Sequence, residues 1–222
     1  IAAETVFALA LNGSNEALMN VDNMSRKFKN KRVRAAAVEA MAAAADTLGI
    51  TSEELADRIV PDLGFDRNLC RMFAYGKRQF NVYLKPSLEM EVFSGDKQIK
   101  TLPKPGTTDD KETAEVAFNE FKEVKKQLKN VVAAQRSRLE YVLMCDRKWT
   151  SENWEKLFVG NAVMHCFAVG LIWGIYENGS LKDTFRYMDD GSFTTADGDE
   201  FTLPNDAQIG LVHPLELTEE QI

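Results

Sequence analysis

The sequence lacks long hydrophobic runs, although 45% of its 222 residues are hydrophobic. No apolar stretch approaches the roughly 20 residues that a helix needs to cross a bilayer. No basic segment precedes an apolar one near the first residue, as it does in a signal peptide. We therefore expect a cytoplasmic protein that has no membrane partner.

Cysteine and histidine are also scarce. The three cysteines, Cys70, Cys145 and Cys166, are an odd and scattered set, which favours a reduced, intracellular protein over a disulfide framework. The two histidines, His165 and His213, have no metal-ligand spacing, and neither a CxxC nor an HExxH motif occurs. A glycine-rich phosphate loop is absent too. The sequence therefore predicts no metal and no cofactor.

Basic charge is sparse in the C-terminal part of the chain. Residues 177–222 contain 11 acidic and two basic residues, a net charge of −9, whereas the whole chain carries −7. Phosphate binding needs lysine and arginine, so this region argues against nucleic acid as a partner. The segment DGDE at 197–200 lacks the ligand pattern of an EF-hand and is typical of a hairpin turn.

Residues 1–64 are predicted to form a helical region. The alanine-rich helix that begins near residue 31 ends at Gly49, a residue type that commonly terminates helices. Thr51 and Glu54 follow with the spacing of a capping box, which predicts the start of the next helix. Two short antiparallel helices around a tight turn are typical of the last unit of a helical-repeat array.

Residues 65–222 are predicted to form one α+β domain. Apolar residues recur at every second position from residue 69, and Phe80, Val82 and Leu84 share one face of a strand. Turn residues separate the runs, so we expect a four-stranded antiparallel meander. The expected strands are near 69–75, 78–85, 88–93 and 97–102.

A long amphipathic helix is expected from about Asp109 to Met144, with a break left open. Four lysines are interpreted as part of its solvent face: Lys122, Lys125, Lys126 and Lys129. Two shorter helices are expected next, one capped by Thr150 and one over about 161–169. A second meander completes the predicted α+β fold. Its strands are expected near 170–176, 181–188, 192–195, 200–203 and 208–212.

The segment LIWGIYENGSLKDTFRY at 171–187 is predicted to be a central hairpin. Its first run is almost entirely apolar, so Trp173 should lie in the core, and Asn178-Gly179 should form a type I′ turn. Gly174 indicates either a close approach of the backbone or a position over which the indole lies.

A Cys–His nucleophile pair is the one catalytic arrangement that the sequence suggests. Cys166 is adjacent to His165, and on a helix their side chains point about 100° apart. Cys145 would meet His165 only through the fold. We expect Cys166 to be a buried core residue, and an enzyme with an active site near His165 and Cys145 is the alternative.

The stretch RKFKNKRVR at 26–34 concentrates positive charge. Such a patch can contact phosphates or an acidic partner, but it is also typical of a solvated connection between helices. We prefer the solvated connection and keep an anion or nucleic-acid contact as an alternative. The six basic residues are Arg26, Lys27, Lys29, Lys31, Arg32 and Arg34.

Several segments, in order over about 55–222, together resemble a known family, the MolR-type bacterial domain of unknown function (four-one-three-two in the usual numbering). They are LADRIVPDLGFD, LPKPGTTDD, AQRSRLEYVLMCDRKWT, LIWGIYENGSLKDTFRY and LPNDAQIGLVHPLELTEEQ. The resemblance implies a domain of a large intracellular protein, associated with the other domains of its own chain and with MoxR-type ATPase systems. It implies no catalytic residues.

Thr218 and Gln221 have capping-box spacing, which predicts a helix that begins there and continues in a longer chain. Together these features favour a non-catalytic interaction or scaffold domain of a large multidomain bacterial protein.

Overall fold

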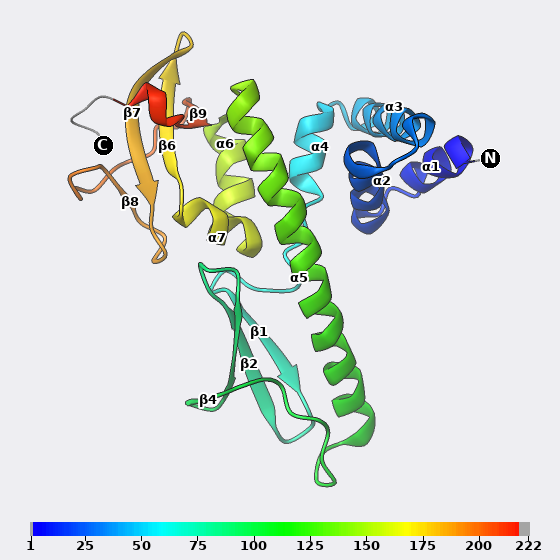
Figure 1. Cartoon of the computed structure of the whole chain (residues 1–222). Helices are drawn as coiled ribbons and strands as arrows, with labels where there is room; N and C mark the ends of the chain where they lie inside the picture. Colours follow the sequence, from blue (N-terminus) through cyan, green and yellow to red (C-terminus); the bar gives the residue numbers. More distant parts are fainter. Residues whose placement is uncertain (1, 218–222) are drawn as a thin grey trace. The chain divides into compact units, whose positions relative to one another are not determined.

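The computed structural model describes residues 2–217, including every side chain in this range except those of Ala2, Ala3 and Lys27 (Figure 1). The helix predicted to begin at Thr218 and Gln221 lies outside the described residues. The chain divides into two compact units, of which the first ends at Pro61 and the second begins at Asp62.

The first unit consists of helices. They are α1 (Ala2–Leu11), α2 (Asn15–Lys27), α3 (Lys31–Leu48) and α4 (Ser52–Arg58). Both predicted boundaries are confirmed: Gly49 ends α3 in the left-handed conformation at φ 67°, and Thr51 and Glu54 form a capping box at the start of α4. Small and branched side chains from all four helices form one core. It includes Val6, Leu18, Val21, Ala37, Met41, Leu55 and Ile59.

The second unit begins with the predicted four-stranded antiparallel sheet, in the order β1-β2-β3-β4. Its strands are β1 (Cys70–Ala74), β2 (Gln79–Leu84), β3 (Met90–Ser94) and β4 (Lys97–Ile99). The alternation read from the sequence is confirmed, because Phe80, Val82 and Leu84 are all buried. These side chains define the inner face of the first sheet.

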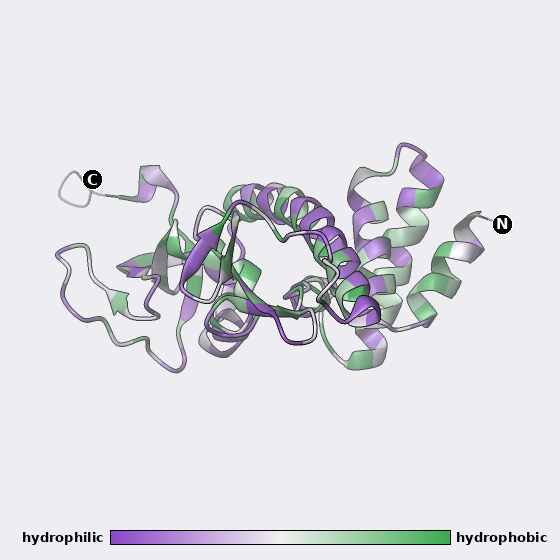
Figure 2. Cartoon of the chain, turned by 90° about the horizontal axis from the view of Figure 1, so that it is seen from below, coloured by the Kyte–Doolittle hydropathy of each residue, from purple (hydrophilic) through white to green (hydrophobic). Residues whose placement is uncertain are grey.

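Helix α5 (Lys111–Cys145) is continuous over 35 residues, so the predicted long helix has no break. Asp110 caps its first turn, and Asp146 ends it in the left-handed conformation at φ 53°. Its apolar stripe packs on the inner face of the first sheet, where the Phe73 and Phe121 rings meet edge to face at 5.5 Å. Hydrophobic and hydrophilic residues alternate along the helix in Figure 2, as its amphipathic sequence requires.

The second sheet is antiparallel, as predicted, but its strand order is not that of a simple meander. The order is β5-β9-β6-β7-β8, so β9 lies between β5 and β6. The strands are β5 (Lys148–Thr150), β6 (Ile172–Glu177), β7 (Ser180–Tyr187), β8 (Phe193–Thr194) and β9 (Gln208–Leu211). An apolar central strand needs a partner on each edge, and β9 supplies the second one.

The strand predicted near 200–203 does not form a ladder. One bridge joins Thr194 to Glu200, and the amide of Phe201 donates to the carbonyl of Phe193. The Phe201 ring stacks on Phe185 with a centroid distance of 5.1 Å. Isolated backbone hydrogen bonds and ring stacking thus hold this segment where the sequence pattern predicted a strand ladder.

Two short helices contribute aromatic side chains to the core of the second sheet, and both were predicted. They are α6 (Ser151–Trp154), which Thr150 caps and which continues as the π-helical turn η1 (Glu155–Val159), and α7 (Ala162–Val169). Trp173 is fully buried beneath them, as predicted. Its ring lies 5.1 Å from Trp154 and 4.6 Å from Phe158, and its indole nitrogen donates to the carbonyl of Ala168 at 3.1 Å.

The opposite side of β6 shows why a glycine follows Trp173. Gly174 pairs with Gly210 of β9. A Cβ atom at Gly174 would lie 2.5 Å from Leu181 Cδ1, and one at Gly210 would lie 2.5 Å from Lys148 Cδ. Neighbouring side chains, rather than another backbone segment or the Trp173 indole, therefore occupy the space at Gly174, so neither of the two expectations for this glycine is confirmed. The hairpin turns as predicted, with positive φ at both Asn178 and Gly179.

Truncating Trp173 tests this account of the core. Trp173→Ala should destabilise the chain by about 3–5 kcal/mol, because loss of a buried aromatic ring leaves a cavity. Urea unfolding followed by circular dichroism would measure the change. Tyr141→Ala, which removes an aromatic ring that is 56% exposed, is the matched control and should change the free energy of unfolding little. A Trp173→Ala variant that unfolds like the parent would contradict the account.

Candidate functional site

The basic stretch 26–34 connects the end of α2 with the start of α3. Arg26 is already paired, since its guanidinium donates to the Asp22 carboxylate one turn earlier at 2.9 Å. The side chain of Lys27 is not described. The other four cations are exposed: Lys29, Lys31, Arg32 and Arg34. Three of these four lie in the first turn of α3, where the helix dipole disfavours positive charge.

His165 is a buried residue of α7. Its Nδ1 atom lies 3.0 Å from the hydroxyl of Tyr187, whereas its Nε2 atom is buried and has no hydrogen-bond partner among residues 2–217. Burial lowers the pKa of His165, although nearby Asp189 opposes this shift. A neutral imidazole that packs against Tyr187 acts here as part of the core.

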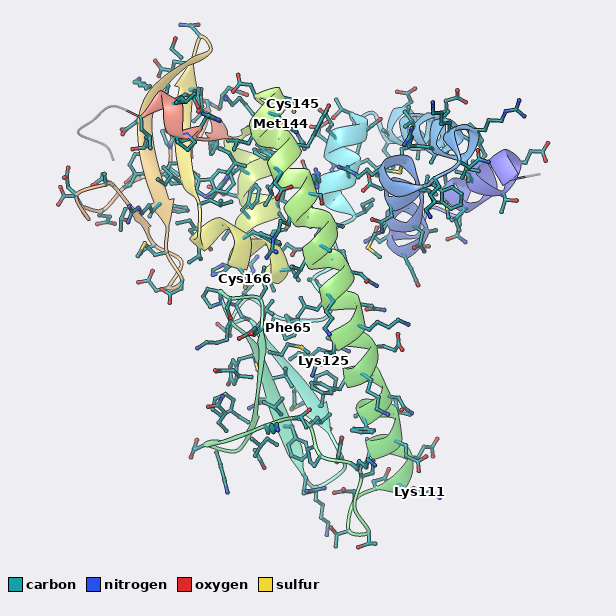
Figure 3. All side chains as sticks on the ribbon, viewed as in Figure 1. Phe65, Lys111, Lys125, Met144, Cys145 and Cys166 are labelled. Carbon is teal, nitrogen blue, oxygen red and sulfur yellow. The ribbon has the colours of Figure 1, made fainter. Side chains whose placement is uncertain are left out.

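The two cysteines considered as nucleophiles lie in different surroundings (Figure 3). Cys145 is exposed at the C-terminal end of α5, and its thiol contacts the carbonyl of Val142 at 3.7 Å. Cys166 is buried on α7, as predicted, and burial raises the pKa of its thiol to about 12. Neither thiol is hydrogen-bonded to His165, so the structure does not assemble the Cys–His pair.

The acidic hairpins of the second sheet border an open hollow of about 580 Å³. Its lining includes Glu177, Asp183 and Asp206, and Lys182 pairs with Glu177 at its edge. Within residues 2–217, no three His, Cys, Asp or Glu side chains gather closely enough to bind a metal ion. Over the same range, no helix combines the length and the apolar character needed to traverse a bilayer.

A second hollow, of about 390 Å³, lies between α5 and the first sheet. Its apolar lining comes from β3, the turn before it and α5, and it consists of Leu88, Met90, Val92, Phe121, Leu128 and Val132. Three cations border it: Lys100, which follows β4, and Lys125 and Lys129 of α5. We refer to this hollow as the lysine-rimmed groove.

The lysine pattern alone did not reveal this groove: four lysines of α5 were predicted to lie on its solvent face, and all four are exposed. At 3.6 residues per turn, Lys125 projects about 40° from Phe121, whereas Lys126 projects about 140° away from it. Lys129 and Lys122 project about 80° and about 100° from Phe121, so they lie on nearly the same side of the helix, although only Lys125 and Lys129 line the groove. Helical angle separates Lys125 from Lys126 but not Lys122 from Lys129, so the groove depends on where the partner sheet ends as well as on the α5 pattern.

The outer face of the first sheet carries four neighbouring side chains, Cys70, Met72, Tyr83 and Phe93, which we name the outer sheet patch. Cys70 stands directly opposite Tyr83 in the ladder, and the Tyr83 and Phe93 rings meet edge to face at 5.6 Å. Met72 is 56% and Tyr83 36% exposed. Burial raises the pKa of the half-buried Cys70 thiol. This sheet thus exposes apolar groups on the side opposite its core.

These elements define an α+β protein that has two antiparallel sheets in its second unit. The family described as domain of unknown function (DUF4132) matches residues 96–222, and the chain belongs to this family. It is also similar to the uncharacterized protein YehI of Escherichia coli (strain K12), with 34% identity over 216 residues. That alignment covers 96% of this chain and 18% of the relative. No solved structure matches the chain.

Thiol labelling should separate the two cysteines. Iodoacetamide at neutral pH should modify Cys145 first, because it is exposed, and should reach Cys166 only after denaturant is added, because that thiol is buried and protonated. Peptide mass spectrometry over time gives both rates. Rapid, selective modification of Cys166 in the native chain would contradict the assignment of this residue to the core.

The buried His165 should make stability depend on pH. Its pKa is lowered in the folded chain, so as the pH falls below about 6.5 the unfolded chain takes up the proton first. The contribution of neutral His165 to the free energy of unfolding is therefore complete above that pH. Below it, this contribution is lost by at most about 1.4 kcal/mol per pH unit. Urea unfolding of the parent at pH 7.5 and 5.5 measures the loss.

His165→Gln should show a smaller loss of stability between these two pH values than the parent. The matched control is His213→Gln, which replaces an exposed histidine and should keep the dependence of the parent. An unchanged pH dependence in His165→Gln would refute the assignment of the effect to this imidazole.

Proposed function

We propose that the chain is a non-catalytic interaction domain of a larger, multidomain bacterial protein. In this proposal the outer sheet patch contacts other domains of the same protein. The observation that carries the proposal is the exposure of Met72 and Tyr83 on a sheet whose opposite face already packs on α5. Contiguous exposed apolar groups on a folded domain are typical of contact surfaces.

The size of the relative supports a partner within the same chain. The chain spans 18% of the length of YehI, so in that protein a large remainder is available to cover such a face. A patch of two aromatic rings, a methionine and a cysteine suits an apolar protein surface better than a charged polymer.

The side chains considered for catalysis do not contact one another, which also favours interaction over chemistry. The Nδ1 atom of His165 is engaged by Tyr187, and Cys145 lies exposed at the end of α5. A nucleophile and its base need hydrogen-bond distance between them, and this pair has no such contact in the part of the chain that is described.

Four further expectations are also part of this proposal. They are the MolR-type assignment, a cytoplasmic location, a helical-repeat array of which residues 1–64 are the last part, and association with MoxR-type ATPase systems. The four-helix core of the first unit supports the repeat, because packed helical hairpins are the building blocks of such arrays.

Labelling of Cys70 tests the proposal directly. In the 222-residue chain, N-ethylmaleimide should reach Cys70, which is half-buried on the outer face. In the longer protein the rate should fall about tenfold or more, because a covering domain excludes the reagent. Cys145 is an internal reference. The pair Met72→Lys and Tyr83→Lys should remove this difference: Cys70 of the variant should react as fast in the longer protein as in the 222-residue chain with the same two substitutions, because two charges cannot be buried there without a partner.

The matched control changes two exposed α5 residues instead, by Val116→Lys and Tyr141→Lys, and should leave Cys70 protected. Equal labelling of Cys70 in the short chain and in the longer protein would show that the outer sheet patch is uncovered, and the proposal would fail.

A further inference from the structure

The lysine-rimmed groove combines two features that do not depend on the proposed contact surface. One is an apolar floor: Phe121 and Leu128 of α5 and Val92 of β3 are buried side chains that face the hollow. The hollow of about 390 Å³ lies within the size range of small-molecule sites. It can therefore accept an apolar body of moderate size.

The other feature is an unneutralised positive rim. Lys100, Lys125 and Lys129 form no ion pair with any residue in the described range 2–217. Lys125 and Lys129 are four residues apart on one helix, where their like charges repel. The lining contains a single carboxylate, that of Glu89. A bound anion would relieve the repulsion among the three lysines.

The lysines cannot be explained only as covers for apolar surface. Lysine stems do pack over apolar residues while their ammonium groups stay in water. Here, however, the side chains as they lie still leave about 390 Å³ open above the apolar floor. The groove thus offers apolar contact and positive charge to the same molecule.

We propose that the lysine-rimmed groove binds an anionic amphiphile. Its apolar chain or ring would lie on Phe121, Leu128 and Val92. Its carboxylate or phosphate head would be held by the ammonium groups of Lys100, Lys125 and Lys129. Lysine acts on such heads as a flexible point charge, so the groove selects for negative charge and apolar length rather than for a particular head geometry.

Isothermal titration of the 222-residue chain with monomeric dodecanoate tests this inference. One molecule should bind per chain, and affinity should fall as salt is added, because ions screen the exposed rim. The pair Lys125→Glu and Lys129→Glu should lower affinity about tenfold or more, since the head would then meet two negative charges. Both side chains are exposed, so the variant should fold, which circular dichroism verifies.

The matched control is the pair Lys111→Glu and Arg136→Glu. It makes the same change in net charge on exposed residues of α5, but Lys111 lies 14 positions before Lys125, Arg136 lies seven positions after Lys129, and neither residue lines the groove. Its affinity for dodecanoate should stay within about twofold of the parent, because distant surface charges contribute little. Dodecyltrimethylammonium has the same chain and the opposite charge, and inorganic phosphate has charge without a chain. Both should bind much more weakly than dodecanoate.

Three results would overturn the inference. They are no binding of dodecanoate, an equal loss of affinity in both double variants, and equal affinity for dodecanoate and dodecyltrimethylammonium. Free and membrane-held sources of the ligand are distinguished by vesicles of phosphatidylglycerol. Binding to vesicles without binding to monomeric dodecanoate would also overturn it, because a flat anionic surface needs no groove. None of these outcomes depends on whether the outer sheet patch is covered in a longer protein.

Discussion

The Trp173 indole meets Trp154 and Phe158 in the core beside the second sheet, and the arrangement of that sheet depends on this contact. The large ring needs helices over one face of β6, and the backbone of this buried strand needs a paired strand on each edge. The short helices α6 and α7, the π-helical turn and strand β9 meet these needs. On the opposite face, Gly174 and Gly210 allow Leu181 and Lys148 to lie close to the backbone. The aromatic contact on one face of β6 and the two glycines on the opposite face together allow this strand to be packed on both sides.

Helix α5 determines what the first sheet can offer to a ligand. Its apolar stripe packs on the inner face, where Phe121 meets Phe73. Strand β4 has only three residues, and the space beyond it is bordered by Lys100 on one side and by the Lys125 and Lys129 pair on the other. One amphipathic helix therefore supplies both the core of this sheet and one wall of the lysine-rimmed groove.

Local patterns in the sequence predicted much of this fold. The cap at Thr51, the turn at Asn178-Gly179 and the core position of Trp173 each follow from a few adjacent residues, because the forces that decide them act over one or two turns. The position of β9 beside β6 could not be predicted in this way, since it depends on pairing between segments more than 30 residues apart. The groove was missed for a related reason: periodicity shows which α5 residues share a face, but not where the partner sheet ends.

Methyl NMR tests most directly the claim that the second unit binds a ligand in the lysine-rimmed groove and not in the aromatic core. Leucine and valine methyl groups of the 222-residue chain would be observed while dodecanoate is added. We expect the signals of Leu128, Val132 and Val92 to shift together and to saturate at one equivalent, while Val163 of α7 stays unchanged. Shifts that centre on Val163, or that never saturate, would contradict the account.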